Sequence, residues 1–391
     1  MRAVHVAPFY HPVIGGVEEV VKRIAEYTAS RGYEVYVVTY NRARVGGVGS
    51  LPREETINGV CVIRLKSDFM WSHGTYSSEL PETLRKLEPD VVHVHVWRHP
   101  HVFQVARLKR KLNFKAILHS HAPFHRLNQL GVVTWLYHRV VDMLMKKVLR
   151  EYDQVIALTP HEKSVLEKKL GVNEDKITVI PNGIDDELAA LAYSVSTSMS
   201  DNIVLYLGRI SYSKNVDLLV RAMVYVKRDV PGSKLVLAGP DEEIIAKLKR
   251  YADKRGIDLR YLGVVSEDEK RKLYSECKVF AHPALYEPFG ITLLEAQAFG
   301  KPCVITGEGG QLYVAPPGKV GVYAEPNPRS YAKAISILLM DRHLYMKLSI
   351  NAKAWASQYI WSKILPKYER LYGELIYSEQ NMCTYCQHRR S

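Results

Sequence analysis

The chain has 391 residues, of which 47% are hydrophobic and 24% charged, and this composition excludes the disordered and collagen-like classes. No stretch reaches the roughly 18 uncharged apolar residues that a membrane span requires, and the odd number of cysteines, five, argues against a disulfide scaffold. The excess of 54 Lys and Arg over 41 Asp and Glu gives a net charge of +13, which predicts an anionic partner but does not distinguish nucleic acid, lipid headgroups and nucleotides.

The first half of the chain alternates strand-like and helix-like segments. An apolar strand is predicted at residues 3–7, directly at the start and without the pattern of a secretory leader, so we expect a cytoplasmic protein. Further strands are predicted at residues 33–40, 91–96, 115–121, 154–159 and 178–180. A helix follows the first strand because its apolar residues recur every 3.6 positions: Val17, Val20, Val21, Ile24, Ala25 and Thr28. Nearly continuous apolar strands between helices indicate a parallel sheet covered on both faces.

A second series of the same kind follows residues 184–199, which are small and polar without a strong period and are predicted to be a linker. Its strands are expected at residues 203–207, 234–238, 259–262, 278–282, 303–306 and 320–324. Ser266 and Glu269 form the pattern of a capping box at the start of one helix. The last 60 or so residues have a helical pattern.

These patterns predict an α/β protein of two doubly wound, Rossmann-like domains that face each other across a cleft. We assign residues 1–183 to the first domain, 184–199 to the linker and 200–354 to the second domain. Residues 355–378 are expected to form a helix that packs back on the first domain, and 379–391 a tail. Ligands of such sheets bind at the carboxyl ends of the strands, so the cleft is the expected site.

The positive charge is concentrated in residues 91–150, where eleven basic residues meet one acidic residue. Within this region, residues 131–150 place an apolar stripe on one face of a predicted helix, and basic residues add charge to it. The stripe consists of Val133, Leu136, Tyr137, Val140, Met143, Leu144 and Val148. A basic amphipathic helix binds anionic membrane surfaces, whereas the alternative is a stripe buried in the core with solvated cations beside it.

The segment from His282 to Gly300 carries the most informative chemistry. A strand ends near His282, a loop carries Glu287, and a helix begins near Gly290 with Glu295 about one turn inside it. The loop backbone and the helix N-terminus offer free N–H groups to a diphosphate. The two carboxylates cannot bind phosphates, but they can accept hydrogen bonds from sugar and ribose hydroxyls. The alternative is two solvated glutamates beside a turn.

Glu287 and Glu295 within EPFGITLLE resemble the paired-glutamate motif of retaining glycosyltransferases of family 4, the group 1 glycosyl transferases, which have the GT-B fold. LGRISYSKN, with Arg209 and Lys214, resembles the Gly-Arg…Lys-Gly/Asn turn of that family. VIPNGID resembles the end of its N-terminal domain, and the Gly15-Gly16 pair resembles its glycine loop after the first strand. The similarity runs from about Ala3 to Tyr372.

The resemblance implies a hexosyltransferase that moves a sugar from a nucleotide diphosphate-sugar to a hydroxyl acceptor with retention. No metal is expected, because the positive groups already present account for the charge. The resemblance also implies catalytic roles for Glu287, Arg209, Lys214 and His121, the last contacting the donor sugar, with His119 as the alternative. It implies donor contacts from Gly15, Gly16, Gly208, Phe289, Gly290, Ile291 and Glu295. Arg209 and Lys214 suit a leaving diphosphate on their own chemistry, because both are cations that follow a strand end.

The acceptor is expected to be a glycan or a membrane glycolipid such as a polyprenyl-linked glycan, which would place the protein at the inner membrane face; no nucleic-acid partner is expected. The loop at residues 307–311 departs from the family pattern, since Gln311 follows the glycines where many relatives have a Glu. Alternative functions are a nucleotide-sugar epimerase or a phosphorylase on the same fold, or a non-enzymatic basic protein that binds membranes or nucleic acid.

Histidine is clustered in the first domain at His93, His95, His99, His101, His119, His121 and His125. Because no carboxylate or cysteine lies at a useful spacing, no metal site is predicted there. Cys383, Cys386 and His388 form a single C-x-x-C with one histidine, which lacks a fourth zinc ligand, so a frayed tail is the expectation.

Overall fold

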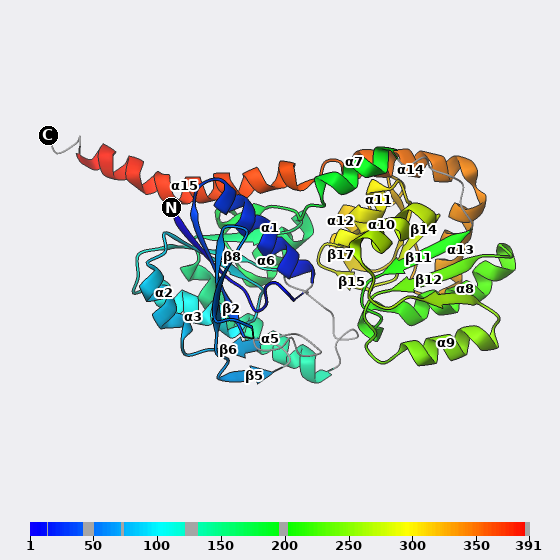
Figure 1. Cartoon of the computed structure of the whole chain (residues 1–391), viewed down its shortest axis with the longest axis horizontal. Helices are drawn as coiled ribbons and strands as arrows, with labels where there is room; N and C mark the ends of the chain where they lie inside the picture. The colour runs from blue at the N-terminus through cyan, green and yellow to red at the C-terminus, as the bar shows by residue number, and fades with distance from the viewer. Residues whose placement is uncertain (14, 42–50, 72–73, 122–131, 195–201, 388–391) are drawn as a thin grey trace. The chain divides into compact units, whose positions relative to one another are not determined.

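Two mainly parallel sheets, one in each of two units of the chain, form the framework of the protein (Figure 1). The computed structural model describes residues 1–13, 15–41, 51–71, 74–121, 132–194 and 202–387, so His125 and His388 lie outside the described residues. Of the described residues, those up to 181 together with 362–387 form the first unit, and residues 182–361 form the second. Helices lie on both sides of each sheet, as the apolar strands predicted (Figure 1).

The sheet of the first unit has the strand order β10-β9-β8-β7-β1-β2-β4-β3, and only β3 runs antiparallel to its neighbour. The order reverses between β1 and β7, which is the switch point of a doubly wound sheet. Its strands are β1 (Arg2–Val6), β2 (Glu34–Tyr40), β3 (Glu54–Ile57), β4 (Val60–Leu65), β7 (Val91–His95), β8 (Lys115–His119), β9 (Gln154–Ala157) and β10 (Ile177–Val179). A separate hairpin joins β5 (Phe69–Trp71) and β6 (Gly74–Tyr76).

The helices of the first unit include one from the far end of the chain. They are α1 (Gly16–Ser30), α2 (Leu80–Leu87), α3 (Pro100–Lys109), α5 (Val132–Val148), α6 (Pro160–Leu170) and α15 (Trp361–Gln387). Glu369 of α15 accepts a hydrogen bond from Tyr27 at 2.8 Å and pairs with Arg31 at 3.1 Å, both on or beside α1. Tyr372 of α15 contacts His93 of β7 at 2.7 Å. The C-terminal helix is therefore part of the first unit.

The sheet of the second unit has the order β13-β12-β11-β14-β16-β18 and is parallel throughout, with its switch point between β11 and β14. Its strands are β11 (Ile203–Leu207), β12 (Lys234–Ala238), β13 (Asp258–Tyr261), β14 (Val279–His282), β16 (Cys303–Ile305) and β18 (Gly321–Tyr323). Its helices are α7 (Asp186–Ser194), α8 (Val216–Asp229), α9 (Ile245–Lys254), α10 (Glu267–Glu276), α11 (Ile291–Ala298), α12 (Gly310–Val314), α13 (Pro328–Met340) and α14 (Arg342–Ala356). The capping box of α10 is formed by Ser266 and Glu269, as predicted.

The structure differs from the sequence-based expectation in three places. The expected linker at 184–199 contains helix α7. Leu188 and Ala189 of this helix are buried within the second unit, and this apolar burial was not evident from the weak sequence pattern. Residues 195–199 lie outside the described part. The C-terminal helix begins at Trp361 rather than 355 and extends through the expected tail to Gln387. The strands between residues 54 and 76 were not predicted, since they are only three to six residues long.

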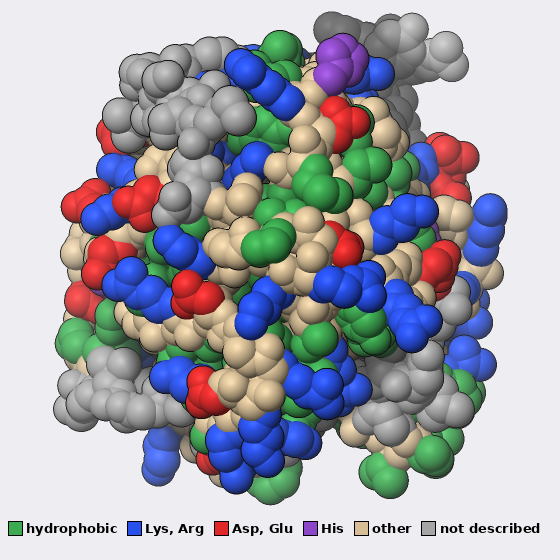
Figure 2. Space-filling view, turned by 90° about the vertical axis from the view of Figure 1, so that its right-hand side faces the viewer, with side chains coloured by type: hydrophobic (Ala, Val, Ile, Leu, Met, Phe, Trp, Pro, Cys, Tyr) green, Lys and Arg blue, Asp and Glu red, His purple; other side chains and the backbone are tan. Residues whose placement is uncertain are grey.

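None of the described helices is long and apolar enough to cross a bilayer. The face of the molecule in Figure 2 carries more Lys and Arg side chains than Asp and Glu side chains. Side chains of both signs are interspersed on this face.

Candidate functional site

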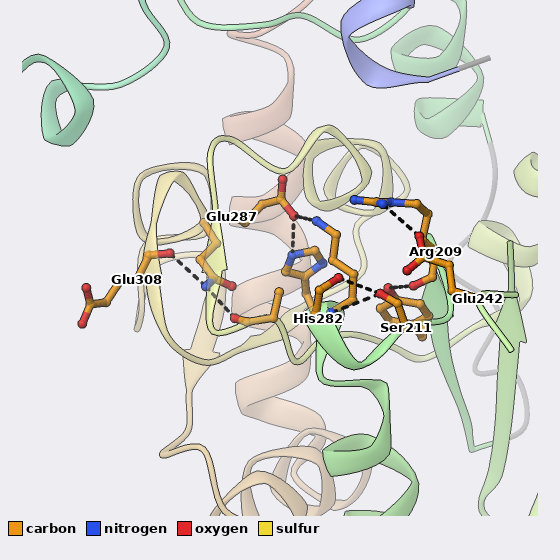
Figure 3. Close-up of polar contacts among 11 residues, drawn as sticks. Arg209, Ser211, Glu242, His282, Glu287 and Glu308 are labelled. Carbon is orange, nitrogen blue, oxygen red and sulfur yellow. Dashed lines mark hydrogen bonds and ion pairs between the residues drawn. The ribbon is translucent and has the colours of Figure 1, made fainter. Parts of the chain in front are cut away.

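The candidate site lies in the second unit, at the carboxyl ends of the two strands that flank its switch point. Lys214 follows β11 at the end of a short 3-10 turn, and Glu287 follows β14 in the two-residue strand β15 (Tyr286–Glu287). The Lys214 Nζ atom lies 2.6 Å from Glu287 Oε2, and the side chains are only 21% and 15% exposed. His282, the last residue of β14, places Nε2 3.4 Å from the same oxygen, and Figure 3 shows its ring facing the carboxylate.

Glu287 carries a negative charge in this setting. Burial raises the pKa of its carboxyl, but the Lys214 ammonium and the His282 ring outweigh burial and hold the pKa well below its usual range. A largely buried carboxylate that stays ionised is a strong hydrogen-bond acceptor, and its neighbour Lys214 is a donor fixed beside it. The pair therefore presents both signs of charge at one point of the sheet edge.

The backbone around Glu287 is held by a strip of glycines. Strand β15 pairs in parallel with β17 (Glu308–Gly309), which places Gly309 opposite Glu287. A Cβ on Gly309 would lie 2.5 Å from the Glu287 carbonyl oxygen, and one on Gly310 would lie 2.1 Å from that of Pro288. Only glycine permits this approach. Gln311 links this loop to its neighbour, because its amide donates to the carbonyl oxygens of Ala284 and Glu308 at 2.8 and 3.1 Å.

Arg209 is more exposed than Lys214, and its guanidinium pairs with Glu242 at 2.9 Å (Figure 3). Its backbone is fixed, since the buried Tyr206 hydroxyl donates to its carbonyl oxygen at 2.8 Å. The turn after it is shaped by Ser211, whose hydroxyl accepts from the Lys214 N–H, and by Asn215, which adopts a φ of 56°. Asparagine tolerates this left-handed conformation, which explains the Lys-Asn sequence at the turn.

Glu295 projects from α11 toward α10 and is engaged at both oxygens. Lys270 donates to Oε1 at 2.9 Å and Tyr274 to Oε2 at 2.8 Å. Each carboxylate oxygen accepts more than one hydrogen bond, so the pair of partners orients Glu295 and leaves capacity for a ligand hydroxyl. Sequence reasoning missed Lys270 and Tyr274, although both lie on one face of a predicted helix at i and i+4.

The remaining donor-side residues of the second unit have mainly backbone roles in the fold. Gly290 has a φ of 96° and caps α11, whose first residue is Ile291, so the first amides of that helix lack intrahelical acceptors. Gly208 directly follows β11 and has a φ of 154°. The ring of Phe289 is buried against Tyr359. A donor contact from Phe289 would therefore come from its main chain.

Gly15, Gly16 and His121 belong to the first unit, whereas Glu287, Lys214 and His282 belong to the second. Gly15 directly precedes α1, and Gly16 is its first residue. His121 follows β8 with a φ of 43°, and burial lowers the pKa of its ring to about 3, which keeps the imidazole neutral.

In the second unit, the structure brings together Glu287, Lys214 and His282, with Arg209 and Glu295 on the same unit. His282 was missed as a site residue, although it ends a strand five positions before Glu287.

Two Rossmann-like units in one chain are the architecture of the GT-B class of α/β fold. Two family models match in succession: Glycosyltransferase Family 4 at residues 14–188, and Glycosyl transferases group 1 at residues 194–355. The chain therefore belongs to the family 4, group 1 glycosyltransferases. This membership excludes the non-enzymatic alternative.

Individual proteins agree with this assignment. An uncharacterized glycosyltransferase of Methanocaldococcus jannaschii is 28% identical, covering 92% of this chain and 94% of its own. One subunit of the phosphatidylinositol N-acetylglucosaminyltransferase of Arabidopsis thaliana is 27% identical over 86% of this chain and 75% of its own. The crystal structure of Anabaena HepE in complex with UDP-glucose has the same fold, with a TM-score of 0.73, 18% identity and coverage of 96% and 100%.

We predict that Lys214→Met destabilises the second unit by about 2 kcal/mol at pH 7, because it leaves the largely buried Glu287 carboxylate poorly compensated. In the wild type the pKa of the Glu287 carboxyl is lower in the folded state than its unfolded value of about 4.3. The ionised carboxylate therefore stabilises the folded state fully above about pH 4.3, and this contribution is lost as the pH falls toward the folded-state pKa. In the variant the pKa rises, and the carboxyl takes up a proton on acidification. The stability difference between the two proteins should therefore narrow below about pH 5.

Urea denaturation at a series of pH values measures this difference. Lys247→Met is the control, because Lys247 is an exposed lysine that contacts only the Tyr212 hydroxyl and ring among the interactions described. A pH-independent difference for Lys214→Met would contradict the proposed charge balance.

Proposed function

We propose that this transferase moves a sugar from a nucleoside diphosphate-sugar to a hydroxyl acceptor with retention of configuration. The observation that carries the proposal is the Lys214–Glu287–His282 group at the switch point of a parallel sheet. Switch points of such sheets bind nucleotides. The UDP-glucose bound by the related HepE fold supports a nucleotide-sugar as the donor class.

The charges in the site suit such a donor. Lys214 and Arg209 are both paired with carboxylates, and a diphosphate would draw these cations to itself as its negative charge increases on departure. Glu287 is the group for donor-sugar hydroxyls, from which it accepts hydrogen bonds as an ionised carboxylate. Glu295, oriented by Lys270 and Tyr274, is the group for ribose hydroxyls. His121 would contact the donor sugar as a neutral ring.

Retention follows if the acceptor attacks from the face that the diphosphate leaves. The bond between the anomeric carbon and the diphosphate oxygen breaks, and the acceptor oxygen forms the new bond on the same face. The acceptor proton passes to the departing diphosphate. This scheme needs no protein nucleophile, and it assigns Lys214 and Arg209 the stabilisation of the charge on the leaving group.

We predict that Glu295→Ala weakens donor binding by about 1–3 kcal/mol, because a buried ribose hydroxyl loses a charged acceptor. Glu287→Ala should lower kcat strongly while the thermal melting temperature shows a folded protein. Calorimetry with a panel of nucleotide-sugars and initial rates measure the two effects. Glu276→Ala, on the same helix as Lys270, is the matched control. Wild-type transfer by both variants would refute this site.

We further propose that the transfer step needs no metal, because Lys214 and Arg209 already supply positive charge at the site. Activity should then persist after dialysis against EDTA, measured as initial rates with and without Mg²⁺ or Mn²⁺. Loss of activity in EDTA with recovery on adding either ion would contradict the proposal.

The acceptor is proposed to be carried on an anionic membrane. Helix α5 turns its apolar stripe outward: Val133 is 84% exposed and Met143 62%. Leu136, Val140 and Leu144 are exposed as well, so the alternative that the stripe packs in the core is wrong for these five residues. The inner side of the helix is formed by the buried Met145 and by Asp142, which pairs with Arg98 at 2.7 Å.

Cations border this stripe. Arg139, Lys146, Lys147 and Arg150 are exposed, and the negative charge of Asp142 is engaged by Arg98. Exposed apolar side chains beside cations match the interface of an anionic bilayer, where each cation adds roughly 1 kcal/mol. The similarity to one subunit of a phosphatidylinositol N-acetylglucosaminyltransferase supports a lipid acceptor.

We predict binding to vesicles that contain anionic lipid, with a steep fall as salt rises. Leu136→Ser with Met143→Ser should reduce co-sedimentation at least fivefold. Ile350→Ser is the control, because Ile350 is 64% exposed on α14, in the other unit. No binding at low salt, or equal binding to neutral vesicles, would leave a water-soluble glycan or metabolite as the acceptor.

A further inference from the structure

Five histidines gather on one face of the first unit's sheet, at the carboxyl end of its central strands. They are His5 on β1, His93 and His95 on β7, His119 at the end of β8 and His121 just after it. All five are at least 92% buried. The strand register produces this grouping, since His5 pairs with His93 and His95 pairs with His119 across adjacent parallel strands. None of these rings is required by the transfer step except His121.

Three of these rings have ring nitrogens close to one another. The ligand atoms of His95, His119 and His121 all lie within 4.8 Å of one another. His95 Nδ1 and His121 Nε2 are 3.5 Å apart. Two nitrogens on a tetrahedral Zn²⁺ with bonds of about 2.0–2.1 Å lie about 3.3 Å apart, so this separation nearly matches that of two zinc ligands.

His119 distinguishes this group from a set of ordinary packed rings. Both of its nitrogens are buried without a hydrogen-bond partner among the described residues. A neutral imidazole always carries one N–H and one lone pair, and leaving them unpaired in the interior is costly. The outer histidines have a partner at one ring nitrogen each: His93 Nδ1 contacts the Tyr372 hydroxyl at 2.7 Å, and His101 Nε2 contacts the His95 carbonyl oxygen at 2.8 Å.

We propose that His95, His119 and His121 bind a divalent transition-metal ion of the zinc type. Neutral imidazoles are the usual ligands of Zn²⁺, and water or hydroxide would complete the coordination. His5 supports the site, because its Nδ1 lies 3.0 Å from His95 Nε2 and fixes the ring nitrogen that faces away from the ion. His119 and His121 stack with ring centroids 3.8 Å apart, so binding turns them out of this stack.

Of the three ligands, only His121 also has a role in the transfer chemistry proposed above, and all three belong to one unit. The expected effect of the ion is on the stability of that unit, because it ties β7 to β8 and the segment after β8. His121 has a φ of 43°, which non-glycine residues seldom adopt. An ion that ligates His121 would offset the cost of that conformation.

The test uses the full chain with Cys383→Ser and Cys386→Ser, so that the C-terminal cysteines cannot take up the probe. After dialysis against EDTA, Zn²⁺ is added, excess is removed, and the bound metal is measured by elemental analysis. We expect one ion per chain and a rise in the melting temperature. Co²⁺ in place of Zn²⁺ should give the visible d–d absorption of a four-coordinate site without a thiolate charge-transfer band.

His119→Asn and, separately, His95→Asn should abolish binding and the rise in melting temperature, while the metal-free variants melt near the metal-free parent. His343→Asn, an exposed histidine on α14, is the control and should keep the ion. Less than about 0.2 ion per chain in the parent overturns the proposal, because a site of three imidazoles should fill under these conditions. Retention of the ion by His119→Asn with its loss in His93→Asn also overturns it, since this would place the ion at His5, His93 and His95 instead.

Discussion

The ion pair between Lys214 and Glu287 is the interaction on which the architecture of the candidate site depends. It joins segments 73 residues apart, one following β11 and the other following β14, at the point where the order of the sheet reverses. Removal of either charge would leave the other in a largely buried position, where a lone charge is strongly destabilising. The pair therefore holds two loops together while keeping a strong donor and a strong acceptor ready for a polar ligand.

The backbone around this pair is constrained as closely as its side chains. Gly309 and Gly310 allow strand β17 to lie against β15, and Asn215 donates its amide to the Pro283 carbonyl oxygen at 3.0 Å. Both contacts fix loops that would otherwise be free to move at the sheet edge. Preorganisation of this kind lowers the cost of aligning charges with a substrate when charge develops during reaction.

The two units use the same topology for different purposes. In the second unit, charged groups from neighbouring loops meet beyond the strand ends. In the first unit, neutral rings from the strands themselves, His93 and His95 among them, occupy the sheet face and are covered in part by Tyr372 of α15. The exposed stripe of α5 belongs to this first unit too, so the features proposed for membrane and metal binding lie in a different unit from the charged group that is proposed to bind the donor.

The sequence by itself determined the class of fold and most of the parallel strands, because apolar periodicity is a local signal. It also singled out Glu287, Glu295, Arg209 and Lys214, through short motifs that resemble those of the family. Only the tertiary structure decided which groups meet. Lys270 and Tyr274 engage Glu295 through helix packing, and His282 joins Glu287 through a turn. His95 and His119 are far apart in the chain and become neighbours through the register of β7 and β8, which depends on long-range pairing and is not encoded in local spacing.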